Sequence, residues 1–160
     1  MPIEDRRQLA YDAATKSLAR QDTTLGNLRN RSTALLTVAA LVTSFGTGVG
    51  LINTSSANGH VFPLWAAYTL LGILVTIGAL TVAVLWPVAG FTFGPSANYI
   101  RNRTLDGVAT DTIVEDLTGL LIGYKVDNEK AITWRMRAFE GGALLLIAEV
   151  VVLILAFVLK

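Results

Sequence analysis

The sequence predicts an all-α integral membrane protein with three transmembrane helices and with cytosolic amphipathic helices before the first and third spans. Of its 160 residues, 52% are hydrophobic and 16% are charged, whereas soluble domains carry roughly a quarter charged residues. No Asp, Glu, Lys or Arg occurs between Arg31 and Arg101, and a surface in water does not tolerate so long an uncharged stretch. Three apolar segments are each close to the roughly 20 residues that a membrane helix needs. We interpret residues 1–160 as one membrane unit.

Residues 4–31 are charged but favour a helix, since no proline follows Pro2 and Gly26 is the one weak position. The residues on the a and d positions of successive heptads are Tyr11, Ala14, Leu18, Gln21, Leu25 and Leu28. Two interpretations of this narrow stripe stay open: packing on another helix of the same chain, or a seam between copies of the chain. The second interpretation makes Leu18, Gln21, Leu25 and Leu28 part of a cytosolic oligomerisation surface.

Residues 33–52 and 64–86 form a predicted membrane hairpin. The first segment has 20 uncharged residues, which cover the ~30 Å hydrocarbon layer at a rise of about 1.5 Å per residue. It follows some thirty charged and polar residues, which argues against a cleaved signal peptide. Residues 53–63 are a short loop of turn-forming residues. The second segment has Trp65 and Tyr68 near one end and Trp86 at the other, where aromatic rings prefer the headgroup zone.

Pro87 and the glycine-rich residues after it end the second span, and Arg101 and Arg103 mark the return to water. Residues 105–107 predict a turn. Thr112 is followed three residues later by Glu115, which is the spacing of a capping box, so a helix is expected to begin near Asp111.

The predicted cytosolic helix 111–140 is amphipathic. Its apolar positions recur every three or four residues, namely Leu117, Leu120, Leu121, Tyr124, Ala131, Trp134 and Ala138. Charged residues, Arg135 among them, are expected on the other sides. We assign Leu117, Leu120, Tyr124 and Trp134 to the cytosolic oligomerisation surface.

Residues 141–159 are a predicted third span of 19 residues, interrupted by one charge at Glu149. No residue stops the preceding helix before this span. Residues 111–160 therefore predict one continuous helix on the order of 70 Å long, with Gly141 and Gly142 as the place for any kink.

The basic residues predict the orientation. Six Lys and Arg precede the first span and six lie between the second and third, whereas residues 53–63 contain none. The amino terminus and segment 87–140 are thus expected to be cytoplasmic, with the carboxyl terminus outside.

Glu149 is the most informative residue, because a carboxyl group within an apolar span is costly and usually faces a bundle interior or a water-filled cavity. No Lys, Arg or His lies at a matching depth, so hydroxyl groups are the expected partners. The candidates are Thr37, Thr43, Ser44 and Thr76. Three roles stay open: a neutral acid that forms one hydrogen bond between helices, a pore-lining or proton-sensitive group, and part of a binding groove.

Small residues on the first two spans predict close helix packing or a polar lining. In the first span Ala40, Ser44 and Gly48 are spaced by four residues, and Gly46 and Gly50 form a GxxxG pair. Gly72 belongs to a similar line in the second span.

Several classes of function are disfavoured. The chain has no Cys and one His, His60, so thiolate chemistry and multi-histidine metal sites are excluded. The 13 basic residues nearly balance the 12 acidic ones, which gives no sign of nucleic-acid binding. Asp111, Glu115 and Asp116 are typical of a helix start. Glu149 has no second catalytic group at its depth, so we expect no enzyme, no cofactor and no metal.

The order of parts resembles the SLATT-type family of small bacterial membrane proteins: a cytosolic helix, a tight membrane hairpin, then a cytosolic helix. The matching stretches are YDAATKSLARQDTTLGNLRNRSTALLTVAALVTSF, the hairpin through Trp86, and DNEKAITWRMRAF. The resemblance implies a protein of the bacterial inner membrane that is the pore-forming output of an antiviral system, encoded beside enzymes that make nucleotide signals. The third span with Glu149 departs from the simplest pattern of that family.

The sequence therefore predicts a homo-oligomeric membrane effector or channel-like pore protein. Several copies would place Glu149, Thr37, Ser44 and Thr76 at a shared interior. Its expected partners are further copies of itself, membrane lipids, and a cytosolic signal nucleotide or partner protein. The alternative is a non-conducting membrane scaffold that recruits a cytosolic partner through its amphipathic helices.

Overall fold

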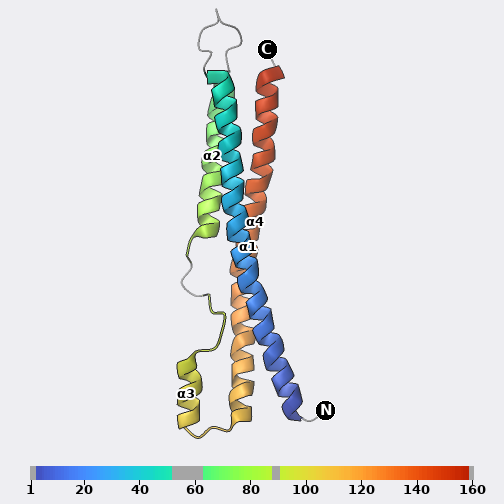
Figure 1. The fold of residues 1–160 in the computed structure, drawn as a ribbon, viewed down its shortest axis with the longest axis vertical. Helices are drawn as coiled ribbons and strands as arrows, with labels where there is room; N and C mark the ends of the chain where they lie inside the picture. Colours follow the sequence, from blue (N-terminus) through green and yellow to red (C-terminus); the bar gives the residue numbers. More distant parts are fainter. Residues whose placement is uncertain (1–2, 52–62, 88–90, 159–160) are drawn as a thin grey trace, which may run out of the picture. The chain divides into compact units, whose positions relative to one another are not determined.

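The computed structural model describes residues 3–51, 63–87 and 91–158, and within these ranges the chain is all-helical with no strand. The four helices are α1 (Ile3–Leu51), α2 (Leu64–Leu85), α3 (Ala97–Leu105) and α4 (Thr110–Val158) (Figure 1). The predicted all-α class is confirmed. The predicted loop 53–63, with His60, lies outside the described residues except for Pro63.

Two long helices run without interruption through the predicted boundaries. α1 covers both the predicted cytosolic helix 4–31 and the described part of segment 33–52, because nothing in this stretch breaks a helix. α4 has 49 residues, or about 74 Å at 1.5 Å per residue, which confirms the predicted continuous helix. Because α4 already begins at Thr110, Thr112 lies inside its first turn and is not the predicted cap.

α2 and α3 are the shorter helices. α2 follows Pro63 and ends before Trp86, whose N–H donates a hydrogen bond to the carbonyl of Val82. α3 is absent from the sequence prediction, since nine residues are too few for a clear apolar period. The predicted turn after α3 is present, and Gly107 adopts the left-handed φ of 72° that glycine tolerates best.

Among the described residues, two helices are long and apolar enough to cross a membrane, α2 and α4. Two of the three predicted spans, 64–86 and 141–159, coincide with these two helices, and segment 33–52 is not among the candidate spans of the described residues. Residues 33–51 are the carboxyl-terminal part of α1, and several of the last of them lie outside the part described with side chains.

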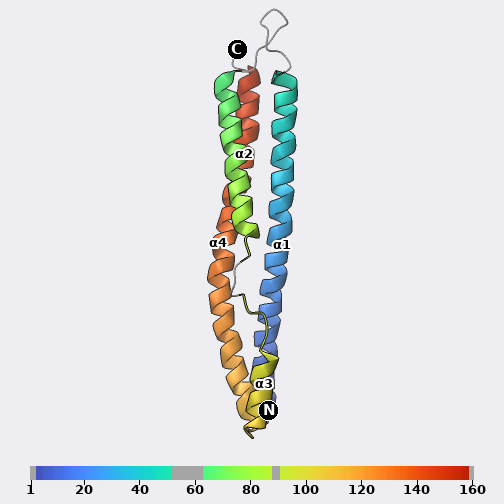
Figure 2. The same ribbon diagram turned by 90° about the vertical axis from the view of Figure 1, so that its left-hand side faces the viewer.

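The chain divides into two compact units, although the sequence suggests a single one. Unit 1 comprises Met1–Asn27 and Pro87–Trp134, and unit 2 comprises Leu28–Trp86 and Arg135–Lys160. In unit 1, α3 runs antiparallel to the amino-terminal half of α4 (Figures 1 and 2).

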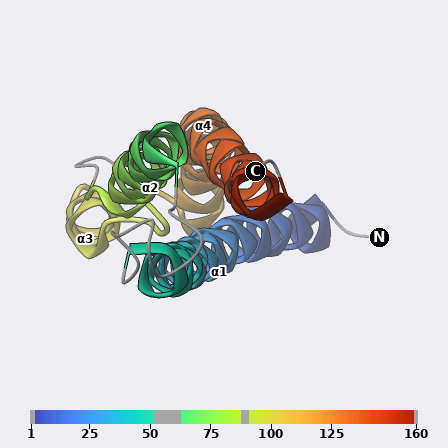
Figure 3. The ribbon, with the colours of Figure 1, turned by 90° about the horizontal axis from the view of Figure 1, so that it is seen from above.

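Unit 2 is a three-helix arrangement in which α2 runs antiparallel to the parts of α1 and α4 beside it (Figures 1 and 2). Seen from above, these three helices lie at the corners of a triangle (Figure 3). One apolar cluster joins them through Leu28 of α1, Val84 of α2 and Ala138 of α4. A second cluster contains Leu70 of α2 and Leu153 of α4.

Buried positions recur every seven residues on both long helices. On α1 they are Leu18, Leu25, Ser32, Ala39 and Gly46. On α4 they are Leu121, Asn128, Arg135, Gly142, Glu149 and Ala156. A strict seven-residue repeat is the pattern of helices that pack as in a coiled coil.

Candidate functional site

Polar residues interrupt the apolar repeat on α4 in each of the two units, and they are the candidate functional residues. Asn128, Arg135 and Glu149 all occupy the same heptad position and are 3%, 2% and 0% exposed, respectively. A buried polar group is costly unless it is hydrogen-bonded, so each of these residues needs a specific partner. Such residues in a coiled-coil seam fix which positions of neighbouring helices face each other.

Glu149 finds its partner within the same chain. Its Oε1 atom accepts a hydrogen bond from the hydroxyl of Thr43 on α1, and both residues belong to unit 2. Its Oε2 atom is buried and has no hydrogen-bond partner among the described residues. One of the four predicted hydroxyl groups thus contacts the carboxyl group.

The other three predicted hydroxyl-bearing residues, Thr37, Ser44 and Thr76, are exposed in the single chain. The hydroxyl groups of Thr37 and Thr76 donate to backbone carbonyls one turn earlier in their own helices, at 3.0 and 2.7 Å. This local bond is the usual one for Thr in a helix and needs no second helix. Pore lining by these residues stays a prediction.

Of the residues predicted to allow close helix packing, one is in contact with a neighbouring helix, and several others are exposed. Gly46 is buried, and a Cβ atom at this position would overlap the side chain of Leu153 on α4. Ala40, Gly48 and Gly72 are exposed, and a Cβ atom on either glycine would meet nothing within 4 Å. The side-chain surroundings of Gly50 lie outside the described residues.

Arg135 is buried, which corrects its predicted place on a solvated side of the helix. Its Nε atom donates to the carbonyl of Val84 at 3.3 Å, and its Nη2 atom donates to the carbonyl of Trp86 at 3.2 Å. The last carbonyls of a helix lack partners within the helix and carry partial negative charge, so a cation is favourable there. Burial, and secondly the charge of Arg29, lower the pKa of Arg135. The amphipathic pattern could not reveal this role, because the partners come from the end of α2.

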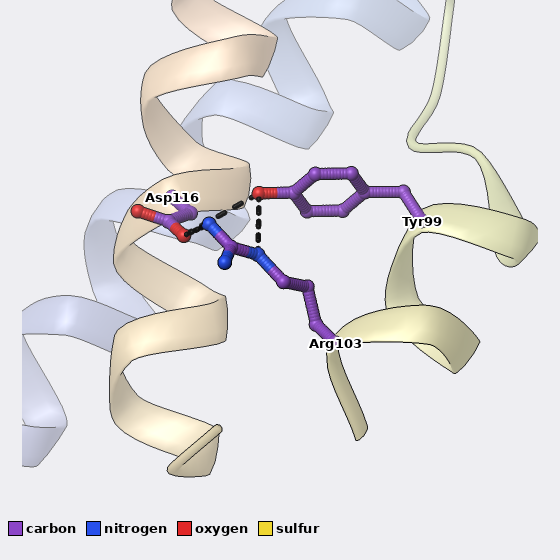
Figure 4. Close-up of polar contacts among 3 residues, drawn as sticks. All are labelled: Tyr99, Arg103 and Asp116. Carbon is purple, nitrogen blue, oxygen red and sulfur yellow. Dashed lines mark hydrogen bonds and ion pairs between the residues drawn. The ribbon is translucent and has the colours of Figure 1, made fainter. Parts of the chain in front are cut away.

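Unit 1 contains a polar contact between α3 and α4 (Figure 4). Arg103 donates from Nη2 to Asp116 at 2.7 Å and from Nε to the hydroxyl of Tyr99 at 3.3 Å. The Tyr99 hydroxyl donates in turn to Asp116 at 3.3 Å. The hydrogen bond with Tyr99, and then the charge of Asp116, raise the pKa of Arg103. This trio anchors a helix that the sequence analysis missed.

Further polar contacts hold the segments of unit 1 on α4. Asn128 donates from Nδ2 to the carbonyl of Thr92 at 3.0 Å, and Gln21 donates from Nε2 to the carbonyl of Lys125 at 3.0 Å. The acidic residues at the start of α4 face Arg7, with N to O distances of 3.6 Å to Asp111 and 3.5 Å to Glu115. Among the described residues, no group of three or more His, Cys, Asp or Glu could hold a metal ion.

Most of the residues predicted for the cytosolic oligomerisation surface are buried or half-buried within the single chain. Leu18, Leu25, Leu28 and Leu117 are buried, and Gln21 and Tyr124 are half-buried. Leu120 and Trp134 are exposed. The stripe of residues 11–28 is thus a buried face of this chain.

A different face of α4 is exposed and apolar within unit 1. It consists of Gly119, Ile122, Gly123, Val126 and Trp134, which we call the α4 outer strip. Gly119, Ile122, Gly123 and Val126 share one face by helical spacing, and Trp134 follows eight residues after Val126, beyond Lys130 on the same face. Gly119 and Gly123 form a GxxxG pair, and of the five residues the sequence analysis singled out only Trp134.

Comparison of the chain with family models, with curated proteins and with solved structures gave no match. The resemblance to the SLATT-type family therefore stays a prediction. The fold alone defines the class: an all-helical protein with two candidate membrane spans.

Proposed function

We propose that the chain is an integral membrane scaffold that crosses the bilayer three times, through residues 33–52, 64–86 and 141–159, and presents a cytosolic face to a helical partner. Membrane insertion is supported by the orientation of apolar side chains. Only 22% of the most apolar window of α2, and the same share for α4, is buried. A core helix of a soluble protein would bury most of such a window.

The observation that carries the scaffold proposal is the α4 outer strip. Ile122, Val126 and Trp134 are 53%, 49% and 56% exposed. Lys125, Glu129 and Lys130 share this part of α4, so this part is expected in water and not in lipid. An apolar strip in water is typical of a protein-binding face. Gly119 and Gly123 leave open space in which the backbone of a second helix can approach.

The environment of Glu149 also favours a scaffold. The expectation of a conduit depended on several copies of the chain sheltering this carboxyl group. In the single chain Glu149 is 0% exposed and Thr43 supplies a hydrogen bond. Shelter from hydrocarbon thus does not require a second copy.

The scaffold proposal is tested by site-specific photo-crosslinking in cells. A photoreactive side chain at Val126 should give an adduct with a different protein, and the same group at exposed Lys125, about 100° around the helix from Val126, serves as the matched control. Ile122→Asp should remove the adduct, because a charge on the strip opposes apolar docking. An adduct that contains only a second copy of the chain would overturn the scaffold and support the next candidate.

The second candidate is a homo-oligomeric, channel-like effector, as the resemblance to the SLATT-type family implies, responding to a cytosolic nucleotide or partner. The specific observation in its favour is the buried Oε2 atom of Glu149 without a hydrogen-bond partner. Such an atom is costly and would gain from water or from a group on another copy. The exposed faces of Thr37, Ser44 and Thr76 offer polar surface to such a copy.

Ion flux from liposomes that contain the purified chain tests this candidate. A channel should conduct, and Glu149→Gln should change the rate or its pH dependence. Flux no greater than that of empty liposomes, together with a monomeric state in the membrane, would exclude the channel and leave the scaffold.

A further inference from the structure

Arginines are concentrated where unit 2 begins on α1 and on α4. Arg29 and Arg31 precede the proposed first span, and Arg135 and Arg137 precede the third. The sequence of unit 2 contains two acidic residues, Glu140 and Glu149. Glu149 lies 14 residues beyond Arg135, or about 21 Å along the helix, so it does not neutralise this group. Glu140 offsets one of the four arginines, so the arginine end of unit 2 carries a net positive charge.

Arg29 and Arg135 lie at the same level of the helical bundle in unit 2. Leu28, directly before Arg29, contacts the cluster formed with Val84 and Ala138, and Ala138 is one turn after Arg135. The charge of Arg29 lowers the pKa of Arg135, as expected for like charges that are close together. The two guanidinium groups thus repel each other, and an anion between them would relieve the repulsion.

The two arginines differ in their hydrogen bonds. Arg135 is engaged with the carbonyls of Val84 and Trp86. Arg29 is half-buried, and its Nε atom is buried without a hydrogen-bond partner. Within the described residues the guanidinium group of Arg29 therefore has no acceptor that offsets its charge, at the place where positive charge accumulates.

We propose that Arg29 binds a phosphate group of an anionic phospholipid, with the charge of Arg135 strengthening the site. The two Nη atoms of Arg29 are not among its buried atoms, and their N–H donors lie in one plane, which matches two oxygens of a phosphate. Arg29 lies one turn before Thr33, where the proposed span enters the hydrocarbon, so the phosphate layer is expected at this depth. Trp86, 64% exposed and adjacent in the chain to Pro87, is a residue typical of the same layer. This inference rests on the proposed membrane insertion.

Thermal unfolding of the full chain in a neutral detergent tests the proposal. Phosphatidylglycerol should raise the unfolding midpoint more than phosphatidylcholine does. Arg29→Gln should weaken the apparent affinity for phosphatidylglycerol about tenfold, because a charged hydrogen bond is lost. Arg31→Gln is the matched control, since it removes the same charge two residues away from an exposed side chain. Arg29→Lys should keep part of the preference, because it keeps the charge without the planar donors.

The outcomes distinguish two questions: whether Arg29 binds a phosphate group, and whether that phosphate belongs to a lipid. Equal losses in Arg29→Gln and Arg31→Gln, or no preference of the wild type for phosphatidylglycerol, would overturn the site. Stabilisation by inorganic phosphate as large as that by the lipid would support the phosphate site and overturn the lipid as its source. If Arg29→Gln does not fold, the wild-type preference and the Arg29→Lys variant decide. Recovery of the chain in the soluble fraction would refute the proposed membrane function, while the phosphate measurement would still test the site.

Discussion

Two arginines on or beside α4 occupy contrasting environments in the two units. Arg103 of unit 1 pairs with Asp116 at the surface, with 40% of its side chain exposed. Arg135 of unit 2 is 2% exposed and donates to the carbonyls at the end of α2. Water already solvates the first arginine, so its ion pair adds little, whereas the second has exchanged water for two backbone oxygens. The comparison teaches that the buried charge of Arg135 in unit 2 is needed for stability, while the exposed charge of Arg103 in unit 1 can be replaced with little loss of stability.

The largest effect is expected for Arg135→Ala. The substitution removes the cation that satisfies the carbonyls of Val84 and Trp86 and leaves a space in a buried layer. We expect a loss of about 3 kcal/mol in the free energy of unfolding, measured by denaturation in detergent micelles. Arg137→Ala is the control, because this side chain is exposed, and its effect should stay within about 0.5 kcal/mol. Equal effects of the two substitutions would refute a structural role for Arg135.

The pair formed by Thr43 and Glu149 should show the next largest effect. Thr43→Val removes the one described hydrogen bond to the carboxyl group, with an expected loss of about 1–2 kcal/mol. In a variant that already carries Glu149→Leu, the same substitution should cost much less, because no buried carboxyl group remains to be satisfied. A double-mutant cycle in micelles measures the difference. Additive effects would mean that the two side chains do not interact.

These buried contacts mark the limit of what the sequence could predict. The apolar period of residues 141–159 and the absence of a helix breaker were enough to predict the long helix α4. The lack of Lys, Arg or His at a matching depth was enough to predict a hydroxyl partner for Glu149. The choice of Thr43 among four candidates depends on the rotation of α1 relative to α4, which a repeat on one helix does not specify.

Arg135 and α3 show why the other predictions failed. Amphipathic analysis places an arginine on the solvated side, since it takes account only of neighbours on the same helix. The partners of Arg135 are backbone carbonyls of another helix, and backbone atoms leave no signature in the sequence. α3 owes its position to contacts of Tyr99 and Arg103 with Asp116, so tertiary contacts outweigh its weak local pattern.

Two glycines of α1, Gly46 and Gly48, differ in how closely another helix approaches them. Gly46→Ala places a methyl group against the side chain of Leu153, which can move only partly, so we expect a loss of about 1 kcal/mol. Gly48→Ala meets nothing within 4 Å and should be neutral or stabilise the chain by up to about 1 kcal/mol, because alanine favours a helix. Thermal unfolding of both variants in micelles provides the test. A loss of stability in Gly48→Ala would indicate that a second copy or another protein packs there.

The smallest effect is expected where the comparison began, at the ion pair of unit 1. Asp116→Asn keeps the size of the side chain and a hydrogen-bond acceptor for Arg103 and Tyr99, but it removes the negative charge. Because solvent and salt already screen charges at a surface, the change in unfolding midpoint should be small at low ionic strength. In about 1 M salt, where the Debye length is about 3 Å, the difference from the wild type should vanish. A large, salt-independent loss would mean that the contact between α3 and α4 depends on this charge as strongly as α2 depends on Arg135, which would remove the contrast between the units.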